Sequence, residues 1–483
     1  MKIIQLFYGT LYDDGVGNTV QIMDDHLKAA GFETEIRNML IEPSMIKNSY
    51  FKEDDIIFYH LSVRMDPLLQ FIKCRKVLVF HNITYPELLI GLNLESLRMD
   101  CACGMYELND TKNQFIEAIA FSEFSRNTLL AHGWKKERVH VLVNTVKQAQ
   151  LDITPDKSII EKYHDGITNI LFTGRIFPNK KQEDIIRAFE YYKRNYNDDS
   201  RLFLVGSVKS DQYDYYLRDL VKRCQLEKNV YFLGFLEWSE YLAYYYVSNL
   251  YICMSAHEGF CRPLLEAMYL NVPILAINET AIPDTLGDGG VLLTSREPSA
   301  VAAEMNRIIK DKRFSDELIM RGHKRYTDFS GQSGEHIWIQ ALKEIVSNTM
   351  EEEIRIRIPN ETVLWESLPK ALDLSDRFES LSQKDIVIYG MGAKGQELIK
   401  KIENETSLSI RCVCDKRIES FRDEGGKYDY CTPEDAVHKY PLGRYVVTVQ
   451  DKLVAIEIAT WLTERGIKRE NIFIYESDTN RIR

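Results

Sequence analysis

The sequence lacks three features that mark large classes of protein: paired cysteines, long apolar runs and an excess of basic residues. Its nine cysteines include no C-x-x-C pair and are odd in number, which favours reduced thiols over disulfides or a zinc site. Nowhere do 18 apolar residues run together, and the start, "MKIIQLFYGTL", has no basic n-region. We therefore expect a cytoplasmic protein, with peripheral attachment to the inner face of a membrane or to other enzymes left open.

The formal net charge of −11 argues against nucleic acid as a partner. A phosphate backbone needs a basic face to displace its counterions. Hydrophobic residues make up 45% of the chain and charged residues 28%, a composition typical of globular proteins with buried sheets. At 483 residues the chain is too long for one ordinary core, so we expect about three domains.

Short apolar runs alternate with helical patterns along most of the chain. "KIIQLFY", "DIIFYHLS" and "NILFTG" are typical of buried strands that end in polar loops, and they predict doubly wound parallel α/β units. The first loop, "GTLYDDGVGN", is expected to run up to a helix that starts at Thr19. The predicted organisation is a first domain at 1–150, a second at 151–346, a charged linker at 347–370 and a third α/β domain at 371–483.

The stretch "SAHEGFCRPLLEAM" places two carboxylates just beyond a predicted strand. Ligands of open α/β sheets bind beyond the carboxyl ends of the strands. We expect Glu258 in the loop and Glu266 in the first turn of a helix that Pro263 starts. Gly259 allows the backbone to approach a ligand closely, so the two carboxylates could accept hydrogen bonds from two separate diols.

With its neighbours, this stretch resembles the E-x7-E signature of the GT4 family of retaining glycosyltransferases, whose two Rossmann-like domains form the GT-B arrangement. "LFTGRIFPNKKQEDIIRAF" is similar to the family's G-R-x-x-x-x-K segment, with Arg175 and Lys180 as its charged pair. "GVGN", with Gly15 and Gly17, resembles the family's first loop, and "FHNIT", with His81, its histidine-bearing strand end. The resemblance covers about residues 1 to 345 and implies that the last helix of the second domain crosses back onto the first.

The resemblance implies how a nucleotide diphosphate sugar would be held. Glu266 would bind the ribose hydroxyls, whereas Glu258 and the amides of Gly259 and Phe260 would hold the transferred sugar. The arginine and lysine of the charged segment would stabilise the diphosphate as it leaves. The two glycines of the first loop would allow close approach of the donor.

The resemblance also assigns residues of the first domain. His81 would contact the donor sugar, and His60 and Asn82 would lie on the acceptor side. The chain has no H-E-x-x-H motif, nor the D-x-D that another glycosyltransferase fold uses to hold a divalent ion. We expect no metal and no cofactor beyond the nucleotide sugar as co-substrate.

The third domain has a glycine motif of its own. "VIYGMGAKGQEL" places Gly390, Gly392 and Gly395 in a G-x-G-x-x-G pattern between a predicted strand and helix, and Asp415 follows the next strand. The pattern resembles dinucleotide-fold domains attached to sugar-modifying enzymes. Such glycines can also serve only close packing of helix on strand, so nucleotide binding and packing both stay open.

The predicted function is transfer of a hexose or deoxyhexose, with retention, from a nucleotide diphosphate sugar to a glycan or lipid-linked acceptor in surface polysaccharide or glycoprotein synthesis. Two alternatives stay open. One is a nucleotide-sugar-binding regulator that has lost turnover, and the other is a GT-B epimerase or phosphorylase acting on related sugars. The base, the sugar, the acceptor and the linkage cannot be inferred from these patterns.

Overall fold

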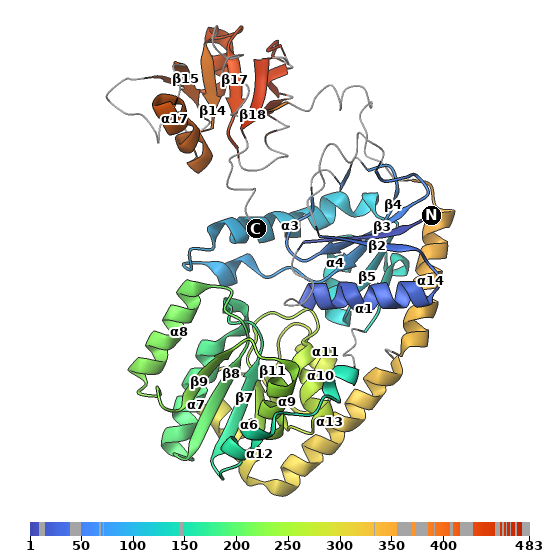
Figure 1. Ribbon diagram of the computed structural model, residues 1–483, viewed down its shortest axis with the longest axis vertical. Helices are drawn as coiled ribbons and strands as arrows, with labels where there is room; N and C mark the ends of the chain where they lie inside the picture. Colours follow the sequence, from blue (N-terminus) through green and yellow to red (C-terminus); the bar gives the residue numbers. More distant parts are fainter. Residues whose placement is uncertain are drawn as a thin grey trace. The chain divides into compact units, whose positions relative to one another are not determined.

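The computed structural model divides into two compact units, Met1–Ile356 and Arg357–Arg483 (Figure 1). No described helix has both the length and the apolar character needed to cross a bilayer. The described residues are 1–8, 15–38, 50–66, 69–70, 72–143, 148–332, 334–354, 370–372, 385–390, 392–405, 409–415, 428–449 and, toward the end, 455, 458–459, 461–463, 465–468 and 471–475.

The first sheet has six parallel strands in the order β2-β1-β3-β4-β5-β6. Every residue of β1 and β3 is buried, as expected of strands covered on both faces. The strands are β1 (Ile3–Phe7), β2 (Thr34–Asn38), β3 (Ile56–Leu61), β4 (Arg75–Phe80), β5 (Glu117–Ala120) and β6 (Val139–Val141). The helices are α1 (Gly15–Ala29), η2 (Pro86–Leu89), α3 (Glu95–Thr111), η3 (Lys112–Gln114), α4 (Glu123–Ala131) and η4 (Lys136–Arg138).

The second sheet is also parallel, in the order β12-β11-β10-β7-β8-β9. Its central strands, β7 and β10, carry the segments that resemble the donor site. The strands are β7 (Thr168–Thr173), β8 (Ser200–Val205), β9 (Val230–Gly234), β10 (Leu250–Cys253), β11 (Ile274–Ile277) and β12 (Val291–Leu293). The helices are α5 (Gln148–Leu151), α6 (Lys157–Tyr163), η5 (Pro178–Lys180), α7 (Gln182–Asn195), α8 (Asp211–Arg223), α9 (Trp238–Tyr246), α10 (Arg262–Tyr269), α11 (Ile282–Leu286) and α12 (Pro298–Lys310).

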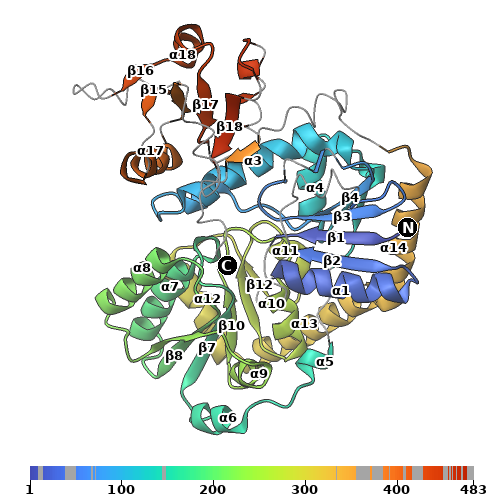
Figure 2. The same cartoon turned by 45° about the horizontal axis from the view of Figure 1, so that its top comes forward.

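Two long helices follow the second sheet. α13 (Lys312–Gln332) packs on α10 and α12, and α14 (Glu335–Glu351) contacts α1, β4 and β5 of the first sheet (Figure 2). The indole of Trp338 on α14 is fully buried and donates a hydrogen bond to the backbone oxygen of Val143, 3.0 Å away. One buried apolar cluster includes residues from both sheets, so α14 helps to join the two halves of this unit.

The second unit has a parallel sheet in the order β13-β18-β17-β14-β15-β16. Most of the predicted linker at 347–370 lies outside the described residues. The strands are β13 (Lys370–Leu372), β14 (Ile386–Tyr389), β15 (Ile410–Cys414), β16 (Asp429–Cys431), β17 (Arg444–Val447) and β18 (Ile472–Tyr475), with helices α17 (Ala393–Glu405) and α18 (Pro433–Lys439). The predicted fold class, α/β with three parallel sheets, is confirmed.

The start of α1 differs from the expectation. The helix begins at Gly15, so Gly15 and Gly17 lie in its first turns and not in a loop. Val16 and Val20 pack against Phe7 at the end of β1. Burial of these two valines on one face favours helix, and it offsets the cost of about 1 kcal/mol that glycine imposes on a helix.

Candidate active site

Glu258 lies in the loop between β10 and α10 and forms a buried ion pair. Its Oε1 is 2.6 Å from Nζ of Lys180, the last residue of η5, and the two side chains are 11% and 14% exposed. Burial by itself raises the pKa of the Glu258 carboxyl, but the charge and hydrogen bond of Lys180 outweigh it and hold the pKa below its ordinary value. Lys180 therefore pairs with a carboxylate at the place where the sequence predicts a phosphate.

Arg175 follows β7 on the loop that leads to the same turn. Its guanidinium carbon lies 6.0 Å from the centre of the Phe177 ring. Its backbone oxygen accepts a 2.8 Å hydrogen bond from Nε2 of Gln182, the first residue of α7. The loop is thereby tied to the start of α7, next to the turn that ends in Lys180.

Glu266 is buried and is the fifth residue of α10, so it lies just past the first turn in which the sequence predicted it. Two tyrosines bind one of its oxygens. Oε2 accepts hydrogen bonds from the hydroxyls of Tyr241 (2.5 Å) and Tyr245 (3.1 Å). A contact between these α9 tyrosines and Glu266 was not predicted, although a spacing of four residues places both on one helical face. Tyr245 also exchanges a 2.8 Å hydrogen bond with Thr173 at the end of β7. Oε1 of Glu266 accepts none from the described part of the chain.

Gly259 is one of the points where the second domain touches the first. A Cβ on this residue would lie 2.8 Å from the backbone oxygen of His81. The carbonyl of Gly259 accepts hydrogen bonds from the hydroxyls of Ser122 (2.8 Å) and Ser125 (3.2 Å), which start α4. Neither serine was predicted from the sequence; the N-cap pattern "SEFS" directly after a buried strand is the signal that could have found them.

The structure brings His60 and His81 together, with 2.8 Å between His60 Nδ1 and His81 Nε2. The other nitrogen of His60 contacts Gln5 Oε1 at 3.1 Å. Both nitrogens are engaged inside the first domain, so the position of His60 gives no support to an acceptor-side role. Asn82 adopts a left-handed backbone (φ 72°), and its side-chain oxygen accepts a hydrogen bond from the amide of Ile83.

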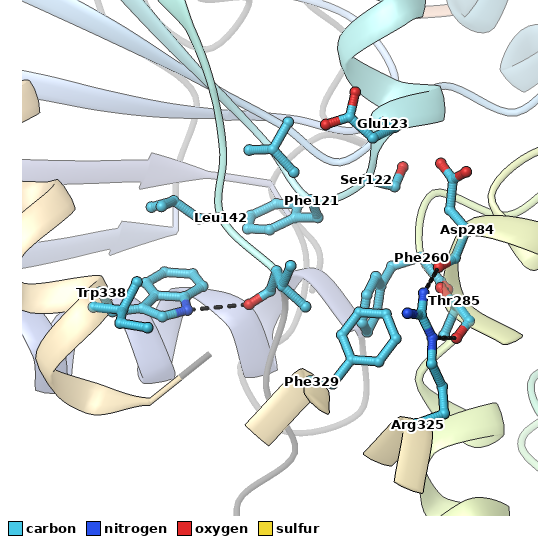
Figure 3. Close-up of a pocket in the computed structure, with 13 residues that line it drawn as sticks. Phe121, Ser122, Glu123, Leu142, Phe260, Asp284, Thr285, Arg325, Phe329 and Trp338 are labelled. Carbon is cyan, nitrogen blue, oxygen red and sulfur yellow. Dashed lines mark hydrogen bonds between the residues drawn. The ribbon is translucent and has the colours of Figure 1, made fainter. Parts of the chain in front are cut away.

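A cavity of about 320 Å³ lies beside the contact of Gly259 with Ser122, between the two halves of the first unit (Figure 3). Of the predicted donor-site residues only Phe260 lines it. Arg325 closes one side by donating to the backbone oxygens of Asp284 and Thr285. The lining residues are Phe121, Ser122, Glu123, Val141, Leu142, Val143, Phe260, Asp284, Thr285, Arg325, Phe329, Ile337 and Trp338.

Two clusters in the described residues have the ligand types of a metal site. Cys253, Glu258 and Cys261 bring one ligand atom each within 4.8 Å of one another, as do Cys412, Asp429 and Cys431. In the first cluster the carboxylate already pairs with Lys180, and the two sulfurs are 3.8 Å apart. A cation there would compete with an ammonium for the same carboxylate.

The glycine motif of the second unit brings β14 and α17 into contact. A Cβ on Gly395 would lie 2.1 Å from the backbone oxygen of Gly390, which itself has φ 107°. Gly392 is exposed, with open space where its Cβ would point. Asp415, just after β15, is 8% exposed. Packing alone thus accounts for two of the three glycines, and the position of Gly392 leaves room for a ligand.

Residues 157–325 match the family model described as Glycosyl transferases group 1. The serotype-specific mannosyltransferase WbdA of Escherichia coli is 24% identical over 197 residues, which are 41% of this chain and 24% of WbdA. The O-antigen chain mannosyltransferase B of Escherichia coli is 25% identical over 232 residues, 47% of this chain and 60% of the relative. The chain thus spans less than two thirds of the length of either relative.

Solved structures resemble the chain over nearly three quarters of its length. Alr3699/HepE of Anabaena in complex with UDP-glucose has a TM-score of 0.56 at 18% identity, covering 72% of this chain and 99% of that one. WaaG, a glycosyltransferase involved in lipopolysaccharide biosynthesis, has a TM-score of 0.54 at 12% identity, covering 71% and 99%. At such identities the likeness shows the fold. Residues 157–325 therefore resemble group 1 glycosyltransferases, and the chain shares the GT-B fold of the solved structures.

Proposed function

We propose that the chain is a retaining glycosyltransferase that moves a hexose or deoxyhexose from a nucleotide diphosphate sugar to a glycan or lipid-linked acceptor. The observation that carries the proposal is the buried pair of Glu258 and Lys180, placed at the carboxyl end of β10 in a group 1 domain. The relatives named as mannosyltransferases favour surface polysaccharide synthesis and make mannose the first sugar to test. A lipid-linked acceptor would bring the protein to the inner face of a membrane.

The donor would be held by four charged side chains that share three tasks. Glu266 would accept hydrogen bonds from the ribose through Oε1, because Oε2 already serves the two tyrosines. Arg175 and Lys180 would bind the diphosphate. As the phosphate draws the Lys180 ammonium toward itself, Glu258 gains an oxygen that can accept from a sugar hydroxyl.

The proposed reaction needs few catalytic groups besides these charged side chains. In a front-face transfer the leaving phosphate accepts the proton of the acceptor hydroxyl, so no general base is required. Arg175 and Lys180 would stabilise the negative charge that develops on the leaving group. Removal of one such preorganised donor typically lowers kcat by 10²- to 10³-fold. We propose that the reaction needs no metal. Activity that is abolished by EDTA and restored by magnesium would contradict this.

A donor panel tests the proposal. The full-length protein is incubated with GDP, UDP, dTDP, CDP and ADP sugars, and both the melting temperature and the release of nucleotide diphosphate are measured. At one hundred times its Kd, a ligand adds about 2.7 kcal/mol of stability. Glu258→Gln should lower turnover by at least tenfold, whereas the rise in melting temperature that the donor causes should stay the same. Glu279→Gln, an exposed glutamate of the same domain, is the control. Tight binding without turnover would favour the regulator.

We propose that the second unit is an accessory domain that tunes acceptor choice or assembly. The residues proposed to hold the donor all lie before Ile356, where the first unit ends. A chain shortened at Ile356 retains α14 and should hydrolyse the donor at the rate of the full-length protein. A shortened chain that is folded by circular dichroism but binds no donor would mean that the second unit completes the site.

A further inference from the structure

A row of hydrogen-bonded polar side chains crosses the interior of the first domain and ends at His81. It starts on α1 with Asp24, continues through Gln5 on β1 and reaches His60 on β3. Gln5 Nε2 donates to Asp24 Oδ1 at 3.3 Å, and the two remaining contacts, at 3.1 and 2.8 Å, link His60 to Gln5 and to His81. Gln5, Asp24 and His60 are 0%, 5% and 3% exposed.

The hydrogen bonds of this row run in one direction, because the carboxylate of Asp24 can only accept hydrogen bonds. Asp24 is a carboxylate whose Oδ2 lies 2.7 Å from the ammonium of Lys28. It must therefore receive the NH₂ group of Gln5, which turns the amide oxygen of Gln5 toward His60. An amide placed the other way round would set its oxygen against a carboxylate oxygen in a buried site.

The direction of the amide fixes the protons of both histidines. Gln5 Oε1 can only accept, so Nε2 of His60 carries a hydrogen. Burial, and then the neighbouring ring of His81, hold the pKa of His60 well below its ordinary value, so the ring is neutral and its Nδ1 is an acceptor. Across the 2.8 Å contact, Nε2 of His81 must donate. Burial lowers the pKa of His81 to about 3, so its Nδ1 has no proton.

We propose that Gln5 and His60 are positioning residues that hold His81 in the Nε2–H tautomer, so that its Nδ1 accepts a hydrogen bond from a hydroxyl of the donor sugar. Among the described residues nothing else binds that nitrogen. The backbone carbonyl of His81 lies against Gly259, next to Glu258. The identity of the ligand rests on the proposed function, whereas the tautomer is a property of the protein alone.

The consequence is a chemical preference at one position of the sugar. A nitrogen lone pair recognises a group that donates, so it selects a hydroxyl against fluorine or hydrogen at that carbon. Loss of one such bond should lower kcat/KM by about tenfold. The opposite tautomer would present an N–H and would tolerate fluorine as a weak acceptor.

The tautomer is tested by nitrogen chemical shifts of isotope-labelled histidine in the full-length protein without ligand. His81 is assigned from the signal that disappears in His81→Phe. The expected result is a protonated Nε2 and a bare Nδ1. Asp24→Asn supplies a donor in place of the carboxylate, so it lets the Gln5 amide turn over and should move the His81 proton toward Nδ1. Asp25→Asn, the exposed neighbour on α1, is the matched control and should leave the spectrum unchanged.

A His81 protonated on Nδ1 in the unaltered protein would overturn the proposal, as would an unchanged His81 tautomer in a folded Asp24→Asn variant. If Asp24→Asn does not fold, Gln5→Met provides the second test. It keeps the side-chain volume and removes the amide, so it should give a mixture of His81 tautomers. A single Nε2–H tautomer in Gln5→Met would show that Gln5 has no control over the ring.

Kinetics then test the link to the sugar. Donor sugars that each carry fluorine at one hydroxyl position are compared in the unaltered protein and in Gln5→Met. We expect one position to cost about tenfold in kcat/KM, and this cost to vanish in the variant while inhibition by the free nucleotide diphosphate stays the same. A cost that persists in Gln5→Met would contradict the relay. If no nucleotide sugar is turned over at all, the proposed function fails, and the tautomer is still judged by the spectra.

Discussion

Replacement of Lys180 by methionine tests the electrostatics of the proposed site most directly. The substitution keeps most of the side-chain volume but leaves the Glu258 carboxylate, 11% exposed, without its cation. Removing one partner of a fully buried pair typically costs 3–5 kcal/mol, because the remaining charge stays desolvated. Some water reaches both side chains here, so we expect about 2–3 kcal/mol, which corresponds to a fall in Tm of roughly 4–12 °C for a domain of this size.

The pH dependence gives the sign of the effect. In the unaltered protein the pKa of Glu258 lies below its ordinary value of 4.5, so its stabilising contribution is present above pH 4.5 and is lost as the pH falls through the lowered pKa. Without Lys180, burial is the main influence left and raises that pKa. The Lys180→Met variant is then less stable above the raised pKa and regains this stability below pH 4.5. The Tm deficit should therefore shrink between pH 7.5 and pH 4.5.

Two controls accompany the measurement by differential scanning fluorimetry. Lys181→Met removes the neighbouring cation, whose partner Glu183 keeps a hydrogen bond from Tyr213. This substitution should lower Tm by less than Lys180→Met does. The double variant Lys180→Met with Glu258→Gln has no stranded charge and should regain most of the lost stability. A deficit that is independent of pH, and that the double variant does not repair, would refute the electrostatic reasoning.

Three further predictions concern other contacts. Gly259→Ala places a Cβ 2.8 Å from the His81 carbonyl, so it should raise KM for the nucleotide sugar about tenfold at nearly unchanged Tm; an unchanged KM would contradict it. Glu266→Gln keeps an oxygen for the tyrosines but loses the charge, and calorimetry should show nucleotide binding weakened by about tenfold or more, with equal affinity as the refuting result. Gly395→Val, with its Cβ 2.1 Å from the Gly390 carbonyl, should make the second unit sensitive to proteolysis while donor hydrolysis continues; a protease-resistant second unit would refute it.

The fold class was predictable because buried parallel strands leave a simple mark on the sequence. "DIIFYHLS" and "NILFTG" are apolar without alternation, since helices cover both faces of the sheet. The start of α1 was not predictable in this way. Gly15 and Gly17 have a low intrinsic preference for helix, and only the packing of neighbouring valines against Phe7, a tertiary contact, outweighs that preference.

The candidate site was predictable to the extent that its residues directly follow strands. Glu258 and Lys180 were singled out by their positions after β10 and β7, but their pairing with each other depends on the three-dimensional arrangement of two loops 78 residues apart. Gln5 was not predicted at all. A lone glutamine in the apolar run "KIIQLFY" has no local signal, and its role emerges only when β1, β3 and the end of β4 lie side by side.

Gly259 is the residue at which the two halves of the proposed site meet. Its carbonyl accepts hydrogen bonds from two serines at the start of α4, and a Cβ on it would lie 2.8 Å from the carbonyl oxygen of His81. Movement of the two domains apart at Gly259 would therefore break the serine hydrogen bonds and separate Glu258 from His81 in one step. A nucleotide sugar held by both residues would bind in proportion to the fraction of molecules in which the two domains are in contact. The affinity for a free nucleotide, which the second domain alone would hold, would not depend on that fraction. In Gly259→Ala, weaker binding of the nucleotide sugar but not of the nucleotide would thus identify a defect in closure, and equal weakening of both would place the defect in the loop after β10 itself.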